Sequence, residues 1–544
     1  MSSTSGSPGD PAARQEAEAP SAGLGVACNT AIFSIATGLS RIAGLAREIV
    51  AAAAFGTSGA ASAFTLAFQI PNLVRGLFAD AALNAAFVPV FTEYLEHKRR
   101  REAVLLASTL FWLILLVLGA ITALFVLIAP YVIPLFIGGQ HFTQSLVDLT
   151  VGLSRVLFPI VVLLGLNGLF AGVLNAHNHF TIPAIAPLVW NLVIIVALVV
   201  LRPMFHGQDQ IYAYAIGVLI GTLVQLLMVI PALRGIDFRL ERVLDWRDPA
   251  VLRVLRLMLP VTIGLGVINI DLLINSLVGT LISEGAPRQI DAAFRIYMLP
   301  QGLFSVALAT VLFPALSRLV ARRDRNGVRA LLGTGTRQNV LLLVPAAVAT
   351  MVLATPVTRL LYEYGKFGPE STHEVATALF WFSFSLPFAG VNLLLTRTFF
   401  SIQQPWIPTR LAALNLVSNL ILSLALYKPF GVAGPVIGTV VASAGMTALQ
   451  TQALRLKLGG TIEGRQTLHA TVRVLIASAA LAAVTGVTWA ALDSALGHES
   501  VPARLVPVAT ALALGFVTYA AVVQRLHVAE AQQIRRFVAA RLGR

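Results

Sequence analysis

Four arginines lie in apolar stretches where a membrane helix ordinarily carries leucine. The sequence places them in SRIAGLAREIVAAAAFG (40–56), IPNLVRGLF (70–78) and AFRIYMLPQG (293–302), as Arg41, Arg47, Arg75 and Arg295. An arginine near the centre of a membrane helix costs about 2.5–3.5 kcal/mol on insertion scales. We therefore expect these side chains to face water, an anion or a carboxylate.

The chemistry suited to several arginines around one cavity is the binding of a large anion. Guanidinium groups bind phosphate through two parallel hydrogen bonds, so the pattern favours a diphosphate-bearing substrate. The acids nearby in sequence, Glu48, Asp80 and Asp291, are too few to neutralise all four arginines. For any single arginine an alternative stays open: its side chain extends to the membrane interface, or it forms an ion pair with one acid and binds no substrate.

The composition indicates the elements that must position these residues. Of 544 residues 57% are hydrophobic and 12% are charged, about half the charged fraction of soluble domains. Apolar runs long enough to cross a bilayer of about 30 Å recur along the chain. We predict an all-α polytopic membrane protein with about fourteen transmembrane helices, near residues 25–55, 62–92, 104–136, 146–174, 182–201, 211–233, 251–282, 289–317, 338–361, 375–401, 408–427, 432–454, 469–492 and 503–524.

Alternate connections between these ranges are basic, and the others carry few Arg or Lys residues. This is the positive-inside pattern, so we expect both termini to be cytoplasmic. The same pattern accounts for the net charge of +14, because the basic residues lie in loops beside anionic lipid. This distribution argues against nucleic-acid binding. The basic segments are 96–102, 234–248, 318–330, 455–465 and the tail 526–544, while residues 1–23 read as a disordered cytoplasmic tail.

An internal repeat divides the chain. Pro89 and Pro314, and likewise Pro183 and Pro408, lie about 225 positions apart within similar segments. We predict two homologous six-helix lobes around a central cavity, related by an axis along the membrane normal. The N-lobe covers residues 24–235, the C-lobe 236–457, and two further helices occupy 458–525.

At these residues the sequence resembles the MurJ (MviN) lipid II flippases, members of the multidrug/oligosaccharidyl-lipid/polysaccharide exporter superfamily. The similar segments are 40–94, GVLNAHNHFTIPAIAP (172–187), RIYMLPQGLFSVALATVLFPALSR (295–318) and TRTFFSIQQPWIPTR (396–410), within about residues 25–525. The resemblance implies transport of the undecaprenyl-diphosphate-linked peptidoglycan precursor from the inner to the outer leaflet of the bacterial cytoplasmic membrane. It assigns substrate binding to the four arginines and to Glu48, where the family usually has Asp.

Two positions depart from the family pattern. Ser62 stands where the family commonly has an Asp, and Met298 where it often has an acid. A gating ion pair that uses those acids is therefore in question in this chain.

The resemblance also suggests a cation site in the second lobe. Asp271 is flanked by Asn269 and Asn275, while Asn415 and Asn419 share one helix face and Thr439 lies on the next helix. Hard oxygen ligands of this kind suit a sodium ion, and no other cofactor is expected. The alternative is a structural hydrogen-bond network around Asp271.

Other function classes fit less well. The chain has no nucleotide-binding P-loop, and its outer loops are short and poor in the acids and histidines that a glycosyltransferase needs, so we expect a transporter rather than an enzyme. An exporter of another polyprenyl-diphosphate glycan, or a cation-coupled multidrug exporter of the same superfamily, remains the alternative. We expect lipid II as substrate, contacts with cell-wall synthesis proteins, and a monomer.

Overall fold

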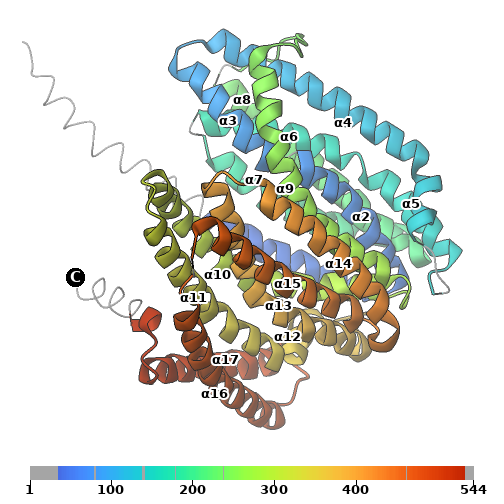
Figure 1. The fold of residues 1–544 in the computed structure, drawn as a ribbon. Helices are drawn as coiled ribbons and strands as arrows, with labels where there is room; N and C mark the ends of the chain where they lie inside the picture. Colours follow the sequence, from blue (N-terminus) through green and yellow to red (C-terminus); the bar gives the residue numbers. More distant parts are fainter. Residues whose placement is uncertain are drawn as a thin grey trace, which may run out of the picture. The chain divides into compact units, whose positions relative to one another are not determined.

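The computed structural model describes residues 35–78, 81–137, 141–177, 179–236, 238–460 and 462–532, and every element in them is a helix (Figure 1). A helix covers residues 35–55. The others are α2 (Gly59–Phe78), α3 (Ala81–Glu96), α4 (Arg100–Phe136), α5 (Gln144–Leu157), α6 (Ile160–Ala176), α7 (Thr181–Leu201), α8 (Tyr212–Gly235), α9 (Pro249–Gly279), α10 (Ala286–Ala321), α11 (Arg325–Val352), α12 (Ala354–Tyr362), α13 (Pro369–Ser401), α14 (Trp406–Phe430), α15 (Ala433–Leu458), α16 (Gly464–Leu496) and α17 (Val501–Arg525), with 3-10 turns at Arg202–Met204 and Gly207–Ile211.

The all-helical membrane fold is confirmed. In the described part of the chain, nine helices are long and apolar enough to cross a bilayer, or ten if the bent pair α11 and α12 counts as one. The most apolar stretch of α4 is only 6% buried, as a lipid-facing helix requires. Each of the predicted ranges contains described helix, while their number as separate crossings stays a prediction.

The described helices pack into two compact units that alternate along the chain. Among the described residues, the first unit contains those within 35–50, 78–125 and 156–259, and the second contains those within 51–77, 126–155 and 260–532. The lobe boundaries drawn from the repeat stay a prediction. Pro183 and Pro408 nevertheless both occupy the third position of their helices, α7 and α14, as the repeat requires of that pair.

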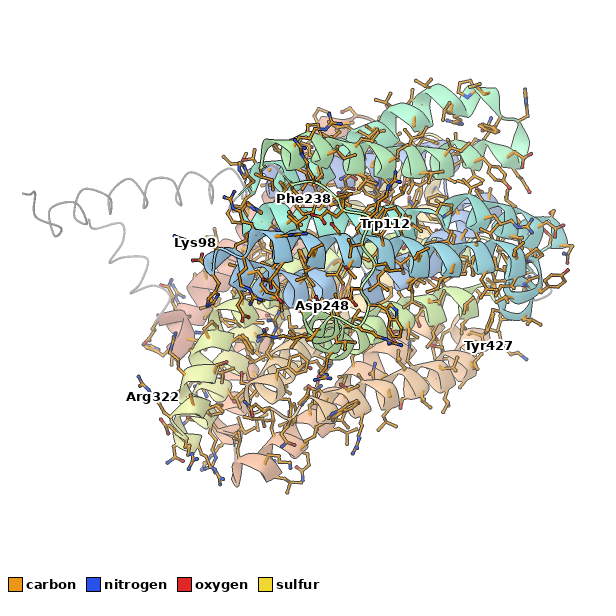
Figure 2. All side chains as sticks on the ribbon, turned by 90° about the horizontal axis from the view of Figure 1, so that it is seen from above. Lys98, Trp112, Phe238, Asp248, Arg322 and Tyr427 are labelled. Carbon is orange, nitrogen blue, oxygen red and sulfur yellow. The ribbon has the colours of Figure 1, made fainter. Side chains whose placement is uncertain are left out.

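The core of the first unit joins α3, α4, α6 and α8 through buried side chains such as Phe87, Phe91 and Leu169. The segment after α8 packs onto α4. The indole of Trp112 donates to the carbonyl of Glu241 at 3.1 Å, and Phe238 is buried in the same cluster (Figure 2). These contacts position the segment that connects α8 to α9.

In the second unit, α10 packs along α13, α14 along α15, and α16 along α17 (Figure 1). The pair α14 and α15 approaches closely because Gly438 carries no side chain. A Cβ there would lie 2.9 Å from Ser423 Oγ and 3.0 Å from Asn419 Oδ1. This approach brings the polar side chains of α14 and α15 together.

Two glycines hold the end of the first described helix against the segment before α13. Gly56 and Gly365 both have positive φ, +61° and +58°. A Cβ on Gly365 would lie 2.4 Å from the carbonyl oxygen of Ala53, and Lys366 donates its N–H to that oxygen at 2.9 Å. Only glycine adopts this conformation without strain at so close an approach.

Within the second unit, an arginine in α11 connects the start of α16 with the segment after α17. Arg337 is ion-paired with Glu463, just before α16, at 2.6 Å, and with Glu530, which follows α17. The Glu530 side chain is only 4% exposed. The arginine thus lies between two acids from distant parts of the chain.

Candidate functional site

Arg47 and Glu48 form a buried ion pair in the first unit. Nη2 of Arg47 lies 2.7 Å from Oε1 of Glu48, and the two residues are 8% and 5% exposed. Both lie on the helix over residues 35–55. Tyr214 of α8 donates its hydroxyl to Glu48 at 3.4 Å, so the carboxylate has a second partner. The pair is therefore held at a fixed place against α8.

Aromatic and amide side chains of α7 complete the surroundings of Arg47. Its guanidinium lies 4.8 Å from the ring centre of Trp190, a cation–π contact, and the Trp190 indole donates to Thr222 of α8 at 3.0 Å. Asn191 donates to the carbonyl of Ser40 at 3.3 Å. Nε of Arg47 is buried and has no hydrogen-bond partner among the described residues. The arginine therefore keeps a donor for a ligand or water.

The other arginines of the first lobe are placed differently. Arg41 lies on the same helix as Arg47, but its side chain is exposed. Arg75 lies in α2, and its side chain is outside the described residues. Whether these arginines share one cavity with Arg47 stays a prediction.

Arg295 shares a carboxylate with an arginine that the sequence reasoning missed. Asp291 accepts from Arg295 Nε at 2.8 Å and from Arg288 Nη1 at 3.0 Å, all on one face of α10. The spacing Arg-x2-Asp-x3-Arg would have predicted this cluster, but Arg288 was counted as part of a loop and lies instead in the first turn of α10. Arg47 and Arg295 thus each have an acid partner.

The two departures from the family pattern lie beside this cluster. Ser62 Oγ accepts the backbone N–H of Arg288 at 3.3 Å. That N–H belongs to the first turn of α10, where helix donors lack partners within the helix, so the serine caps the helix. Met298 is 44% exposed and, because it is uncharged, it offers no partner for a gating ion pair.

The predicted cation-site residues do come together in the second unit. Asn419 Nδ2 donates to Asp271 Oδ1 at 2.7 Å and to Asn275 Oδ1 at 3.1 Å. Asn275 Nδ2 donates to Thr439 Oγ1 at 2.8 Å, and Thr439 Oγ1 lies 3.4 Å from Asn419 Oδ1. One network thus joins α9, α14 and α15.

Two further residues complete the description of this network. Ser423, which the sequence reasoning missed, donates to Asn419 Oδ1 at 3.1 Å. Asn415 lies one turn before Asn419, and its buried Oδ1 has no hydrogen-bond partner among the described residues. One carboxylate, several amide oxygens and an unpartnered amide oxygen are donors that a hard cation accepts. The side chain of Asn269 lies outside the described residues.

The many apolar helices and the buried charges within them define a multi-spanning helical membrane protein of the transporter type. Two solved structures share the fold. A structure of "Lipid II flippase MurJ, inward closed conformation" aligns with TM-score 0.72 and 23% identity over 91% of this chain and 99% of that one. An inward-facing MATE family multidrug resistance transporter of the MOP superfamily aligns with TM-score 0.66 and 15% identity, over 77% and 94% of the two chains.

Sequence comparison narrows the class to one family. The family model described as "Lipid II flippase MurJ" matches residues 51–508. A lipid II flippase MurJ of Burkholderia cenocepacia is 34% identical over 69% of this chain and 73% of its own length. A probable lipid II flippase MurJ of Vibrio cholerae is 30% identical over 91% and 95%. The chain belongs to the lipid II flippase MurJ family, as the sequence motifs indicated.

Proposed function

We propose that this protein translocates lipid II, the undecaprenyl-diphosphate-linked peptidoglycan precursor, from the inner to the outer leaflet of the bacterial cytoplasmic membrane. Family membership supports the proposal. Within the structure, the observation that carries it is the buried Arg47, whose Nε has no partner in the described part of the chain. A buried guanidinium with a spare donor suits a phosphate oxygen.

The proposed diphosphate ligands are Arg41, Arg47, Arg75 and Arg295. Glu48 and Asp291 compensate the charge of two of them when no substrate is bound, which lowers the cost of keeping arginine inside a membrane protein. A diphosphate then competes with the carboxylates for the guanidinium groups. Substrate binding thereby rearranges side chains that also contact α7 and α8.

The proposed transport cycle is alternating access between the two predicted lobes. The loop charges support cytoplasmic termini at both ends, so the precursor enters on the side of the basic connections. A transporter of this kind needs a bias between its two states, which a bound ion supplies only through different affinities for them. The Asp271 network is the proposed sodium site, with Asn415, Asn419 and Thr439 as the other oxygen ligands.

The decisive experiment replaces the native flippase of a depletable bacterial strain with this chain. The readout is which lipid-linked precursor accumulates and in which leaflet. Restored growth with lipid II reaching the outer leaflet supports the proposal. Accumulation of lipid II in the inner leaflet, despite folded protein in the membrane, would contradict it and favour another polyprenyl-diphosphate glycan or a drug as substrate. Co-purification tests the predicted contacts with cell-wall synthesis proteins. Native mass spectrometry tests the predicted monomeric state.

A further inference from the structure

A cavity of about 760 Å³ lies where α15 ends and α16 begins, within the second unit. None of the candidate substrate or sodium ligands lines it. Its polar lining comes from both helices and the turn between them: Thr451, Arg455, Glu463, Arg465, Gln466 and His469. The cavity is therefore a separate feature that the proposed transport function does not use.

The lining is cationic because its one acid is already paired. Glu463 accepts from Arg337 of α11 at 2.6 Å and shares that arginine with Glu530, so the three side chains together carry one negative charge, which the two arginines of the lining outweigh. Arg455 of α15 and Arg465 of α16 are both exposed, and neither forms an ion pair among the described residues. His469 donates from Nδ1 to the carbonyl of Arg465 at 2.7 Å, which leaves Nε2 for a ligand. Two full positive charges thus line one hollow.

The start of α16 adds donors to the same cavity. The N–H of Thr467 is the first to bond within the helix, to the Glu463 carbonyl at 3.0 Å. No side chain caps the helix, and Gly464, Arg465 and Gln466 line the cavity. Helix N-termini favour anions, so the backbone reinforces the attraction of the two arginines.

Exposed leucines beside these charges distinguish a lipid from a soluble anion. Leu456, next to Arg455, is 74% exposed, and Leu468, next to His469, is 64% exposed. The exposed apolar surface continues along α16 at Val472 and Leu475. A basic hollow at the end of a membrane helix, bordered by an apolar helix face, matches a phosphate headgroup with acyl chains below it.

We propose that this cavity binds the headgroup phosphate of an anionic phospholipid of the surrounding membrane. Arg455 and Arg465 bind the phosphate from two helices, and the acyl chains lie along α16. The loop charges assign this end of α15 and α16 to the cytoplasmic face, where anionic lipid attracts basic segments. The bound lipid thereby joins α16 to α15.

The test uses the full chain, purified in a neutral detergent and titrated with dioleoyl-phosphatidylglycerol or dioleoyl-phosphatidylcholine. Native mass spectrometry counts the retained lipids and gives their apparent Kd. We expect phosphatidylglycerol to be retained in preference to phosphatidylcholine. Replacing both arginines, Arg455→Gln with Arg465→Gln, is expected to weaken that binding by about tenfold or more, since each basic residue contributes about 1 kcal/mol.

The matched control removes the same charge elsewhere. Arg100→Gln with Arg101→Gln changes two exposed arginines at the start of α4, in the first unit, and neither of them lines the cavity. This control is expected to bind phosphatidylglycerol as the unchanged protein does, and Arg455→Lys with Arg465→Lys is expected to retain most of the binding. Thermal unfolding verifies that each variant is folded.

Three results would overturn the proposal. The first is equal retention of phosphatidylglycerol and phosphatidylcholine. The second is an equal loss in the cavity variant and the control. The third is displacement of the lipid by millimolar sn-glycerol 1-phosphate, which would identify a soluble phosphate as the ligand. Each result is independent of whether the protein transports lipid II.

Discussion

Asn419 Nδ2 lies 2.7 Å from Asp271 Oδ1 and 3.1 Å from Asn275 Oδ1, so a single amide group of α14 joins two positions on α9. The amide nitrogen, a donor, therefore points to the carboxylate. A cation in that place requires the amide to turn its oxygen inward. The described arrangement is closed on itself, and the proposed sodium ion would favour a second one in which the amide oxygen faces the ion.

The first prediction concerns the charge of this network. Sodium is expected to raise the midpoint of thermal unfolding of the purified protein, because an ion that binds only the folded state stabilises it. Asp271→Asn removes the one formal negative charge, so the sodium-dependent rise is expected to vanish. The measurement is a set of unfolding scans in sodium, potassium and choline chloride at equal ionic strength.

The matched control for Asp271→Asn is Ser423→Ala. It removes a hydrogen bond of 3.1 Å to Asn419 but leaves the charge in place, so the sodium response is expected to remain. If the unchanged protein responds equally to all three salts, Asp271 has a structural role. Coupling would then come from the membrane potential, worth about 2.3 kcal/mol per charge per 100 mV.

The second prediction concerns Arg47. Arg47→Ala is expected to abolish complementation of the depleted strain and also to lower the unfolding midpoint, because Glu48 is left buried without its cation. Removing both charges, Arg47→Ala with Glu48→Ala, is expected to restore the midpoint without restoring transport. Arg47→Lys is expected to restore transport only in part, because lysine lacks the planar fork.

Tyr214→Phe is the control for this pair, because it removes the long 3.4 Å hydrogen bond to Glu48 and leaves both charges in place. Its complementation is expected to be nearly normal. Arg75→Ala is expected to abolish transport as Arg47→Ala does, with normal insertion. Full complementation by the Arg47→Ala, Glu48→Ala variant would show that the pair is structural.

The third prediction concerns the shared carboxylate of α10. Asp291→Asn removes the carboxylate that Arg288 and Arg295 share, so we expect a loss of about 3–5 kcal/mol in unfolding free energy. Adding Arg288→Gln is expected to recover part of that loss, since one of the two repelling charges is removed. Denaturant unfolding of the purified variants measures both.

Glu284→Gln is the matched control, since Glu284 is an exposed acid just before α10 and its loss is expected to cost less than about 0.5 kcal/mol. Additive losses in the Asp291→Asn, Arg288→Gln double variant would argue against coupling between the two side chains.

The fourth prediction separates strain from crowding at Gly365. Alanine at this position meets both a positive φ and the carbonyl oxygen of Ala53 at 2.4 Å. Gly459→Ala meets a positive φ of +68° in the left-handed region, and its added Cβ would meet only Arg329 Nη2, at 3.7 Å. Gly459→Ala is expected to cost about 1–2 kcal/mol, and Gly365→Ala clearly more. Equal shifts of the unfolding midpoint would mean that the contact with Ala53 readily relaxes.

The sequence predicted helices well because apolar runs report which segments lipid surrounds. The range predicted at 211–233 is α8, Tyr212–Gly235, and that predicted at 408–427 is α14, Trp406–Phe430. The larger errors lie where helices extend beyond the bilayer. One range was predicted to begin at 338, whereas α11 begins at Arg325 and the chain bends by 73° before α12. Hydropathy does not record a bend.

For the candidate sites, local spacing was informative and distant pairing was not. Asp271, Asn419 and Thr439 come together as the family resemblance implied, and helical spacing had placed Asn415 and Asn419 on one face. Trp190 and Tyr214, which surround the Arg47 pair, carry no signal in the sequence, since aromatic residues are common in membrane helices. Their role depends on packing between helices distant in the chain.

The arginine of α11 has a consequence for the order of membrane insertion. Arg337 is synthesised 126 residues before Glu463 and 193 residues before Glu530. At synthesis rates of about 5–20 residues per second, roughly ten to forty seconds pass before its second acid emerges from the ribosome. During that interval the guanidinium must stay hydrated at the membrane surface, and arrival of the C-terminal segment allows it to be buried. The arrival of Glu530 therefore completes the assembly of a helix inserted much earlier.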